Sequence, residues 1–259
     1  RGVSAYPAEV THQMVANFTS GGAAINQLCK VFGVELGVEA MSLERPTGDI
    51  CSAPAMSEDE TITAMRAGMD AVKPGADVYC LGEMGIGNTT PAAAICHALY
   101  GGDAGEWTGP GTGLEGQALA AKAGFVAQAT GLHKDAIKDP LDVICRLGGR
   151  ELAAIAGAVI AARFRRIPVI LDGYVCTAAA APLEAFCAGA LDHCQVGHVS
   201  SEPGHRILLE RLSKEPLVDL DMRLGEASGA VLAVGLLKAA AACHSGMATF
   251  ADAGVSEKP

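Results

Sequence analysis

Apolar and polar positions along the chain group into short apolar runs, separated by longer segments with helical spacing. Two apolar runs are short and end at turn residues, which is typical of buried strands: ADVYCL at 76–81 ends at Gly82, and IPVIL at 167–171 ends at Asp172-Gly173. The pattern predicts a third strand at 194–199, and a β-branched run at 33–40 predicts another. The chain is therefore expected to contain several short strands that helices cover.

Helix start signals separate these runs. Ser57 and the three acidic residues after it mark the start of a helix. Thr89 or Thr90 can cap a further helix with Pro91 in its first turn, whereas the glycine-rich segment 101–113 predicts a loop. Further helices are predicted at 7–18, 23–32, 151–163 and 226–243.

Alternation of strands and helices predicts an α/β fold, in which helices cover a parallel sheet. In such a sheet, the loops after the carboxyl ends of the strands line the ligand crevice. The turns at 82–90, 172–173 and 200–204 follow predicted strands, so they are expected to converge. No repeat or linker divides the 259 residues, which suits one large domain or one domain with a small appendage.

Composition narrows the class of protein. Half of the residues are hydrophobic and only 4% are aromatic, so Ala, Val, Leu and Ile must build the core, and alanine-rich stretches such as 239–242 favour closely packed helices. A net charge of -10 argues against a nucleic-acid partner, which needs a basic face. The sequence has no uninterrupted apolar run of about 20 residues, so no membrane span is expected. No signal peptide is expected at the start.

Cysteine and histidine usage gives no metal pattern. Nine cysteines are scattered from Cys29 to Cys243 without a CxxC pair, which predicts reduced thiols in the cytoplasm and makes disulfides the less favoured alternative. The sequence Asp192-His193-Cys194, with His198 and His205 nearby, matches no common zinc spacing. These histidines are interpreted as packing or capping residues, and neither a metal nor another cofactor is predicted.

The stretch LGEMGIGNTTPAAA at 81–94 places a carboxylate inside a glycine-rich turn. It lacks the Gly-Lys-Ser/Thr of a Walker loop, and Thr90 stands where a dinucleotide fingerprint has its third glycine. It is either a tight strand-to-helix turn or a site where glycine amides bind a phosphate while Glu83 accepts hydrogen bonds from ribose hydroxyls. The glutamate favours the sugar-phosphate interpretation.

The stretch RLGEASGA at 223–230 places Glu226 in the first turn of an apolar helix. A surface glutamate there would interact favourably with the helix dipole, by a fraction of a kcal/mol. Alternatively, its small and apolar neighbours raise its pKa, so that it acts as a base near neutral pH. Lys122 lies in an alanine-rich run, where most lysines point to solvent, and the sequence alone does not assign it to a ligand.

Six stretches together resemble one known family. They are GVSAYPAEVTHQMVANFTSGGAAIN, LGEMGIGNTTPAAA, DPLDVICRLGGRELAAIAGA, VILDGYV, GHVSSEPGH and LDMRLGEASGA. In this order they resemble the nicotinate-nucleotide–dimethylbenzimidazole phosphoribosyltransferase family over nearly the whole chain. The resemblance implies transfer of the phosphoribosyl group of nicotinate mononucleotide to 5,6-dimethylbenzimidazole, which gives α-ribazole 5′-phosphate and nicotinate for the lower ligand of cobalamin. It also implies a Rossmann-like sheet, a small helical subdomain formed by about 1–32 and 226–259, and a homodimer.

The resemblance implies roles for individual residues. Glu226 matches the catalytic glutamate of the family, Glu83 belongs with the ribose, and Lys122 matches a lysine of the phosphate region. Tyr6 and Met14 fall where some relatives carry polar residues beside the base. The other substrate-binding residues implied by the resemblance are Gly85 and Gly87 in the phosphate region, Asn88, Asp172, Gly173, Ser200, Arg223 and Leu224.

One departure and two alternatives remain. The family normally has a further N-terminal portion, in which a strand ends in an Asp-His-Gly turn, so a sheet strand and part of the helical subdomain are expected to lie outside these residues. One alternative activity is the same transfer to another base, such as adenine or a phenol. Another is a non-catalytic nucleotide-binding protein, which the joint presence of Glu83, Lys122 and Glu226 disfavours.

Overall fold

In a computed structural model, which describes residues 2–256 and 258, the protein folds around a four-stranded parallel sheet in the order β1-β2-β3-β4. Leu81 pairs with Leu171, which in turn pairs with Val196, so the carboxyl ends of the strands lie along one edge. This confirms the predicted α/β class and parallel sheet. The strands are β1 (Tyr79–Leu81), β2 (Val169–Leu171), β3 (Cys194–Ser200) and β4 (Pro216–Met222).

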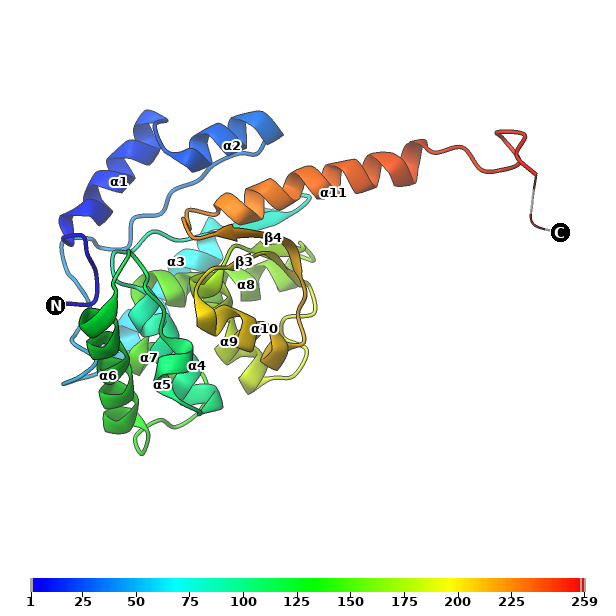
Figure 1. Ribbon diagram of the computed structural model, residues 1–259. Helices are drawn as coiled ribbons and strands as arrows, with labels where there is room; N and C mark the ends of the chain where they lie inside the picture. Colours follow the sequence, from blue (N-terminus) through cyan, green and yellow to red (C-terminus); the bar gives the residue numbers. More distant parts are fainter. Residues whose placement is uncertain (1, 257, 259) are drawn as a thin grey trace.

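Helices cover both faces of the sheet (Figure 1). On one face lies α11 (Ser228–Gly246), with α2 (Ala24–Phe32) packed against it and α1 (Glu9–Ser20) continuing towards the N-terminal end of the chain. The other helices lie on the opposite side. They are α3 (Glu58–Ala71), α4 (Thr89–Tyr100), α5 (Ala104–Trp107), α6 (Gly116–His133), α7 (Asp142–Leu147), α8 (Arg150–Phe164), α9 (Tyr174–Phe186) and α10 (Pro203–Leu212).

A small apolar cluster joins α1 and α2 to the beginning of α11. Phe18, Ile25 and Cys29, from α1 and α2, are buried with Val231 of α11. Whether about 1–32 and 226–259 form a small helical subdomain stays a prediction.

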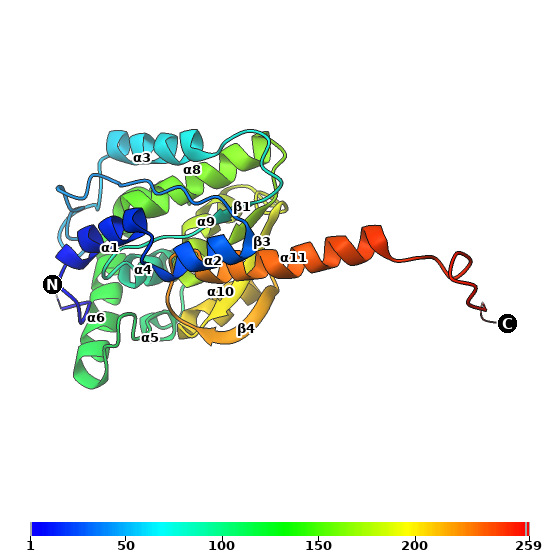
Figure 2. The ribbon, with the colours of Figure 1, turned by 90° about the horizontal axis from the view of Figure 1, so that it is seen from above.

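The second half of α11 projects away from the body of the protein, as Figures 1 and 2 both show. Its residues from Leu236 to Gly246 are exposed. By length and composition alone α11 is one candidate for a membrane-crossing helix among the described residues, although its first turns are buried against β3 and α2. Helices in protein cores meet the same criteria, so this observation is weak support for a span.

Small residues allow the close helix packing that the composition predicts. Helices α3 and α8 touch through their backbones: a Cβ on Gly68 would lie 1.8 Å from Ala154 O, and one on Gly157 would lie 2.0 Å from Met65 O. No larger side chain fits at either position without separating the helices. Glycines thus set the spacing of α3 and α8. The alanine-rich stretch 239–242, which was expected to favour close packing, is instead exposed on the projecting half of α11.

Strand predictions are correct for the central strands and wrong at the periphery. The strand predicted at 33–40 does not form, because Gly33 ends α2 in the left-handed conformation (φ 59°) and the extended chain after it has no ladder partner among the described residues. In the predicted strand at 76–81, only Tyr79–Leu81 pairs. Strand β4 has an exposed, charge-interrupted pattern and was not predicted.

Helix predictions differ mainly at their first residues. The capping box between Ser57 and Glu60 confirms the predicted start of α3. Within the predicted loop 101–113, the short helix α5 forms because the Asp103 carboxylate accepts from Gly105 N at 2.9 Å. Asn88, not Thr89 or Thr90, occupies the N-cap position of α4, and α11 begins at Ser228 instead of residue 226.

Candidate active site

The carboxyl edge of the sheet opens into a cavity of about 550 Å³. The turns after the first three strands, the segment 223–226, the loop 111–113 and the N-terminal segment with α1 build its wall. The predicted convergence of these turns is therefore confirmed. Lys122 does not line the cavity. The predicted site residues that line it are Tyr6, Met14, Glu83, Gly85, Gly87, Asn88, Asp172, Gly173, Ser200, Arg223, Leu224 and Glu226.

Direct backbone contact joins the turn after β1 to the segment before α11. A Cβ on Gly82 would lie 2.1 Å from Ala227 N, and Glu226 N donates to Glu83 O at 3.0 Å. Glu226 and Ala227 both have left-handed backbones, with φ of 63° and 61°, which is uncommon outside glycine. Glu226 thus precedes α11, which corrects its predicted position in the first helical turn, and its carboxylate lines the same cavity as Glu83.

The Glu226 carboxylate has the properties of a proton acceptor. Its Oε2 atom is buried and has no hydrogen-bond partner among the described residues. Burial raises the pKa of Glu226 above its ordinary value, partly offset by the backbone of Ile25. The direction agrees with the sequence-based expectation. A carboxylate with a raised pKa and a free oxygen in a cavity is suited to accept a proton near neutral pH.

Two further carboxylates share the cavity. Burial raises the pKa of Glu83 to about 8, against the lowering effect of a hydrogen bond from Asn88 Nδ2 to Glu83 Oε2. Burial, and to a smaller extent the charge of Glu226, raises the pKa of Asp172 to about 7, against the lowering effect of backbone hydrogen bonds. Burial and like charge thus both act against full ionisation of the carboxylates that line the cavity.

Asp172 also fixes the start of α11. This residue, directly after β2, is buried, and its Oδ1 atom accepts from Ala230 N at 2.9 Å. The His198 Nε2 atom lies 3.6 Å from the same oxygen. A carboxylate at the N-terminus of a helix is stabilised by the helix dipole and by the free N–H groups. Asp172 therefore helps to hold the segment that carries Glu226.

Lys122 is fully buried, so the interpretation that it points to solvent is wrong. Its Nζ atom donates to Thr89 Oγ1 at 2.7 Å and to Gly109 O at 2.8 Å. Burial lowers the pKa of Lys122, and the charge of Glu202 opposes this shift. Thr89 lies at the start of α4 and lines the cavity, so Lys122 supports the cavity wall from behind.

The loop 109–113 connects several parts of the wall. Gly111 N donates to Glu202 Oε1 at 2.7 Å, and an Arg223 guanidinium nitrogen donates to Gly111 O at 3.2 Å. Thr112 Oγ1 accepts from Ala5 N at 2.9 Å and is hydrogen-bonded to Ser4 Oγ at the same distance. The loop thus holds the N-terminal segment that brings Tyr6 to the cavity.

The histidines have packing and hydrogen-bonding roles, as predicted. Ser200 N donates to His205 Nδ1 at 2.8 Å, and burial lowers the pKa of His205 to about 3, so its ring is neutral. His193 Nε2 lies 3.0 Å from Val159 O. Within residues 2–256 and 258, no group of His, Cys, Asp or Glu has the arrangement of a metal site.

Sequence reasoning missed two carboxylates of this region. Glu202 is buried, and its Oε1 atom binds the loop 109–113. Glu151 lies in the first turn of α8 and approaches Asn88. Each has a local sequence signal. Glu202 directly precedes Pro203 at a helix start, and Glu151 follows the sequence Gly148-Gly149-Arg150. Neither pattern shows which side chain the glutamate would meet.

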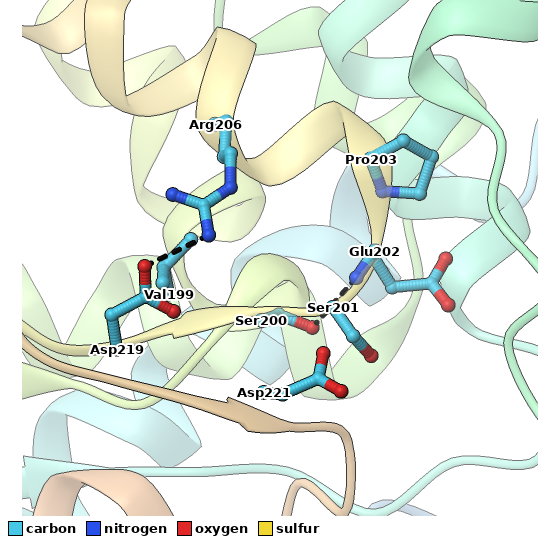
Figure 3. A pocket seen from close by; sticks show the side chains of 8 residues that line it. All are labelled: Val199, Ser200, Ser201, Glu202, Pro203, Arg206, Asp219 and Asp221. Atoms are coloured by element: carbon cyan, nitrogen blue, oxygen red, sulfur yellow. Dashed lines mark hydrogen bonds and ion pairs between the residues drawn. The ribbon is translucent and has the colours of Figure 1, made fainter.

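A second, smaller cavity of about 140 Å³ lies beside the first, between β3, β4 and the start of α10 (Figure 3). Ser200 and Glu202 line both cavities. In Figure 3, Arg206 pairs with Asp219 at 2.8 Å and Glu202 N donates to Ser200 Oγ, while the Glu202 carboxylate points away from this pair. The arginine is thus already paired, and this cavity offers no free cation to a ligand.

Comparison with known proteins assigns the family. The sequence model of a family described as phosphoribosyltransferase matches residues 1–255. Two curated relatives, from Sinorhizobium medicae and Cereibacter sphaeroides, are each 59% identical and are named nicotinate-nucleotide–dimethylbenzimidazole phosphoribosyltransferase. The alignments cover 100% and 99% of this chain, respectively, and 76% of each relative.

Solved structures agree with the sequence comparisons. A crystal structure of CobT from Thermus thermophilus is 41% identical, with a TM-score of 0.88 over 99% of this chain and 82% of that chain. A structure of the nicotinate-nucleotide–dimethylbenzimidazole phosphoribosyltransferase from the same organism has a TM-score of 0.86 at 40% identity, with the same coverage. The chain, with its parallel sheet and carboxylate-lined cavity, belongs to the nicotinate-nucleotide–dimethylbenzimidazole phosphoribosyltransferase family.

Proposed function

We propose that the protein transfers the phosphoribosyl group of nicotinate mononucleotide to 5,6-dimethylbenzimidazole, giving α-ribazole 5′-phosphate and nicotinate for the nucleotide loop of cobalamin. The observation that carries this proposal is the Glu226 carboxylate, which has a buried, unpartnered oxygen among the described residues and a raised pKa in a cavity of about 550 Å³. Family membership and the names of the relatives support the choice of substrates.

The reaction needs a base more than it needs an acid. In the substrate, the nicotinate ring is a pyridinium bonded to ribose C1′. When this C–N bond breaks, its electron pair goes to the ring nitrogen and neutralises the positive charge. One imidazole nitrogen of the incoming base attacks C1′ from the opposite face and inverts its configuration from β to α. Glu226 accepts the proton from the other nitrogen of the base. Positioning and proton removal therefore account for the catalysis.

The other groups of the cavity suit the nucleotide. Glu83 accepts hydrogen bonds from the ribose hydroxyls. The phosphate lies near Gly85, Gly87 and the first residues of α4, where free N–H groups and the helix dipole favour an anion. Lys122, behind Thr89, adds positive charge to the same region. The remaining substrate contacts are assigned to Asn88, Asp172, Gly173, Ser200 and Arg223.

An apolar part of the wall suits the methylated aromatic acceptor. Val10 and Met14 of α1, Ile86 and Leu224 line the cavity beside Tyr6. Their side chains offer little hydrogen bonding to an acceptor with polar substituents, such as adenine. This lining favours dimethylbenzimidazole over adenine or a phenol. Competition among the three bases, followed by mass analysis of the nucleotide products, tests the preference. If the adenine or phenol product predominates, dimethylbenzimidazole is not the preferred acceptor.

We further propose that the protein works as a cytoplasmic homodimer. The exposed half of α11 carries Leu236 and Leu237, and the segment after it carries exposed Met247 and Phe250. A second copy of the chain would cover these side chains. Sedimentation of the purified protein measures the oligomeric state, and a monomer at micromolar concentration would contradict the dimer.

A direct assay tests the reaction. Protein, nicotinate mononucleotide and dimethylbenzimidazole are mixed, and release of nicotinate and formation of α-ribazole 5′-phosphate are followed together. Equal amounts of both products are expected. A folded protein, including any N-terminal portion that its relatives possess, that yields neither product would refute the function. Nucleotide binding by calorimetry without either product would instead support a non-catalytic nucleotide-binding protein.

A further inference from the structure

Glu151 connects the first turn of α8 to the turn after β1. Asn88 Nδ2 lies 3.4 Å from Glu151 Oε1, and the same amide nitrogen donates to Glu83 Oε2. One amide group thus bridges two carboxylates. We propose that Glu151 is a positioning residue that holds the Asn88 amide, which in turn orients Glu83 towards the ribose. This inference rests on the proposed function, in which Glu83 contacts the ribose.

The hydrogen-bonding capacity of the three groups suits this bridge. The NH2 group of asparagine has two hydrogens to donate, and a carboxyl group keeps an accepting oxygen whether or not it is protonated. Asn88 Nδ2 faces one oxygen of Glu83 and one oxygen of Glu151, so the amide can donate to both. Without Glu151, the amide would have only one carboxylate to orient it, and rotation about its side-chain bonds would be less restricted.

Two glycines leave the space that the bridge occupies. A Cβ on Gly85 would lie 2.9 Å from Asn88 Nδ2 and 3.0 Å from Glu151 Oε1. A Cβ on Gly149 would lie 2.9 Å from Glu151 Oε2. Gly85 is not among the residues with positive φ, so its backbone does not require glycine. Glycine is required because a side chain at this position would collide with the bridge. Gly85 therefore helps to position Glu83 as well as to form the turn.

Position distinguishes the two carboxyl groups. Glu83 lines the substrate cavity and Glu151 does not, so Glu151 anchors the amide from behind and Glu83 faces the substrate. Burial raises the pKa of Glu151, while the N–H groups at the start of α8, the Asn88 amide and Arg150 oppose this shift. The charge of Glu151 also raises the pKa of Glu83, less than burial does.

A double-mutant cycle tests this arrangement. Initial rates give KM for nicotinate mononucleotide and kcat for the wild type, E151A, N88A and E151A/N88A, and calorimetry gives the dissociation constant of the nucleotide. We expect E151A to raise KM roughly tenfold, at the lower limit of the effect of losing a hydrogen bond to a charged group, and to change kcat little. In the N88A background, E151A should have no further effect on KM.

The control is E58A, because Glu58 also lies in the first turn of a helix but is exposed and has no hydrogen bond to the bridge among the described residues. It should leave KM unchanged. E151Q retains an acceptor oxygen and side-chain shape, so it should recover most of the affinity that E151A loses. This variant also keeps the cycle interpretable if E151A proves unstable by thermal melting.

Two outcomes would overturn the bridge. An unchanged KM in E151A would show that Glu151 does not position the site. An equal rise in KM in the wild-type and N88A backgrounds would show that Glu151 acts by another route, as a merely structural residue would. The proposed function fails separately, if the wild-type protein neither binds nicotinate mononucleotide nor releases nicotinate.

Discussion

Two glycine-rich loops border the cavity, and they differ in the charge that they enclose. The turn 82–88, after β1, surrounds the carboxylate of Glu83 and approaches Glu226 through its backbone. The loop 109–113, between α5 and α6, encloses the buried ammonium group of Lys122. The two loops are thus both rich in glycine, but the turn 82–88 contributes the acidic side chain of Glu83 to the cavity wall, whereas the loop 109–113 surrounds the basic Lys122 behind it.

The comparison shows that these glycines make room for side chains as well as exposing amides. A Cβ on Gly85 would lie 3.0 Å from Glu151 Oε1, whereas one on Gly111 would lie 2.7 Å from Thr89 Oγ1 and 2.9 Å from Lys122 Nζ. Nicotinate mononucleotide carries an anionic phosphate, which is assigned to the start of α4, and an uncharged ribose, which is assigned to Glu83. Lys122 lies behind Thr89 at that helix start, so the basic support is on the phosphate side of the cavity.

The largest effect is expected from the acidic side, at Glu226. E226Q keeps the size and hydrogen-bonding shape of the side chain but cannot accept a proton at neutral pH. Turnover at saturating substrates should fall by roughly 10²–10⁴-fold, the usual contribution of a placed general base. Nicotinate mononucleotide should bind to the mutant as tightly as to the wild type, as measured by calorimetry, because its contacts are assigned to other residues.

Near-normal turnover in E226Q would contradict the proposed mechanism. In that case Glu226 would be a structural residue whose removal alters only stability. Thermal melting separates the two cases, because loss of a base changes the rate without a comparable change in the melting temperature. If E226Q shows both low turnover and a large loss of stability, turnover is measured well below its melting temperature, where unfolding no longer contributes to the loss of rate.

A smaller effect of the acidic wall concerns pH and stability. Glu83 has an ordinary pKa of 4.5 and a folded pKa of about 8, so between these values the folded protein binds a proton that the unfolded chain has released. The free energy of unfolding should therefore fall as pH rises through this window, by at most about 1.4 kcal/mol per pH unit. E83Q is neutral throughout and should not show this contribution.

The measurement is the difference in unfolding free energy between wild type and E83Q, from pH 5 to pH 9, without ligand. Between about pH 5 and 8, we expect the free energy of unfolding of the wild type to fall relative to that of E83Q by roughly 2–5 kcal/mol. Above about pH 8 the difference should be constant. The buried His205, with its lowered pKa of about 3, has the opposite pH dependence but contributes equally to both proteins. A difference that does not vary with pH would show that Glu83 is charged in the folded protein.

On the basic side, K122M should weaken nucleotide binding. Methionine retains much of the buried apolar stem but removes the charge and the hydrogen bonds to Thr89 and Gly109. Loss of the positive charge behind Thr89, on the side of the cavity to which the phosphate is assigned, predicts a rise in the dissociation constant of roughly 10–100-fold, with a smaller effect on saturated turnover. K134M, at an exposed lysine that caps the same helix, is the control. Equal affinities in K122M and wild type would remove the charge argument for this loop.

The extent to which the sequence predicted this site also differs between the loops. The central strands and the turns after them could be predicted, because apolar runs and glycine-rich turns are local signals. Most of the individual cavity residues, such as Tyr6, Met14 and Arg223, were implied only by the resemblance to the family. Burial of Lys122 could not, since an alanine-rich helix with one lysine looks the same whether that lysine meets solvent or Gly109 O. Its partners lie 33 and 13 positions away in the chain.

Backbone conformation and long-range pairing account for the other errors. Glu226 was predicted to lie in the first turn of an apolar helix, but its backbone N–H donates to Glu83 O and its backbone is left-handed instead. Thr89 was predicted as a cap, although its hydroxyl accepts from Lys122. The segment 33–40 has a β-branched pattern without a neighbouring strand to pair with. In each case a tertiary contact overrides a local preference.

The smallest effect is expected from the turn itself, at Gly87. Its φ of 86° is strained for any other residue, so G87A should lower the free energy of unfolding by about 1 kcal/mol. G75A is the matched control, because Gly75 has a φ of 83°, open space around it and no place in the cavity wall. The two mutants should lose similar stability in chemical denaturation, but only G87A should raise KM for nicotinate mononucleotide, since the phosphate is assigned to its side of the turn. An unchanged KM in G87A would limit Gly87 to a backbone role, and the phosphate contacts would then belong to the loop 109–113.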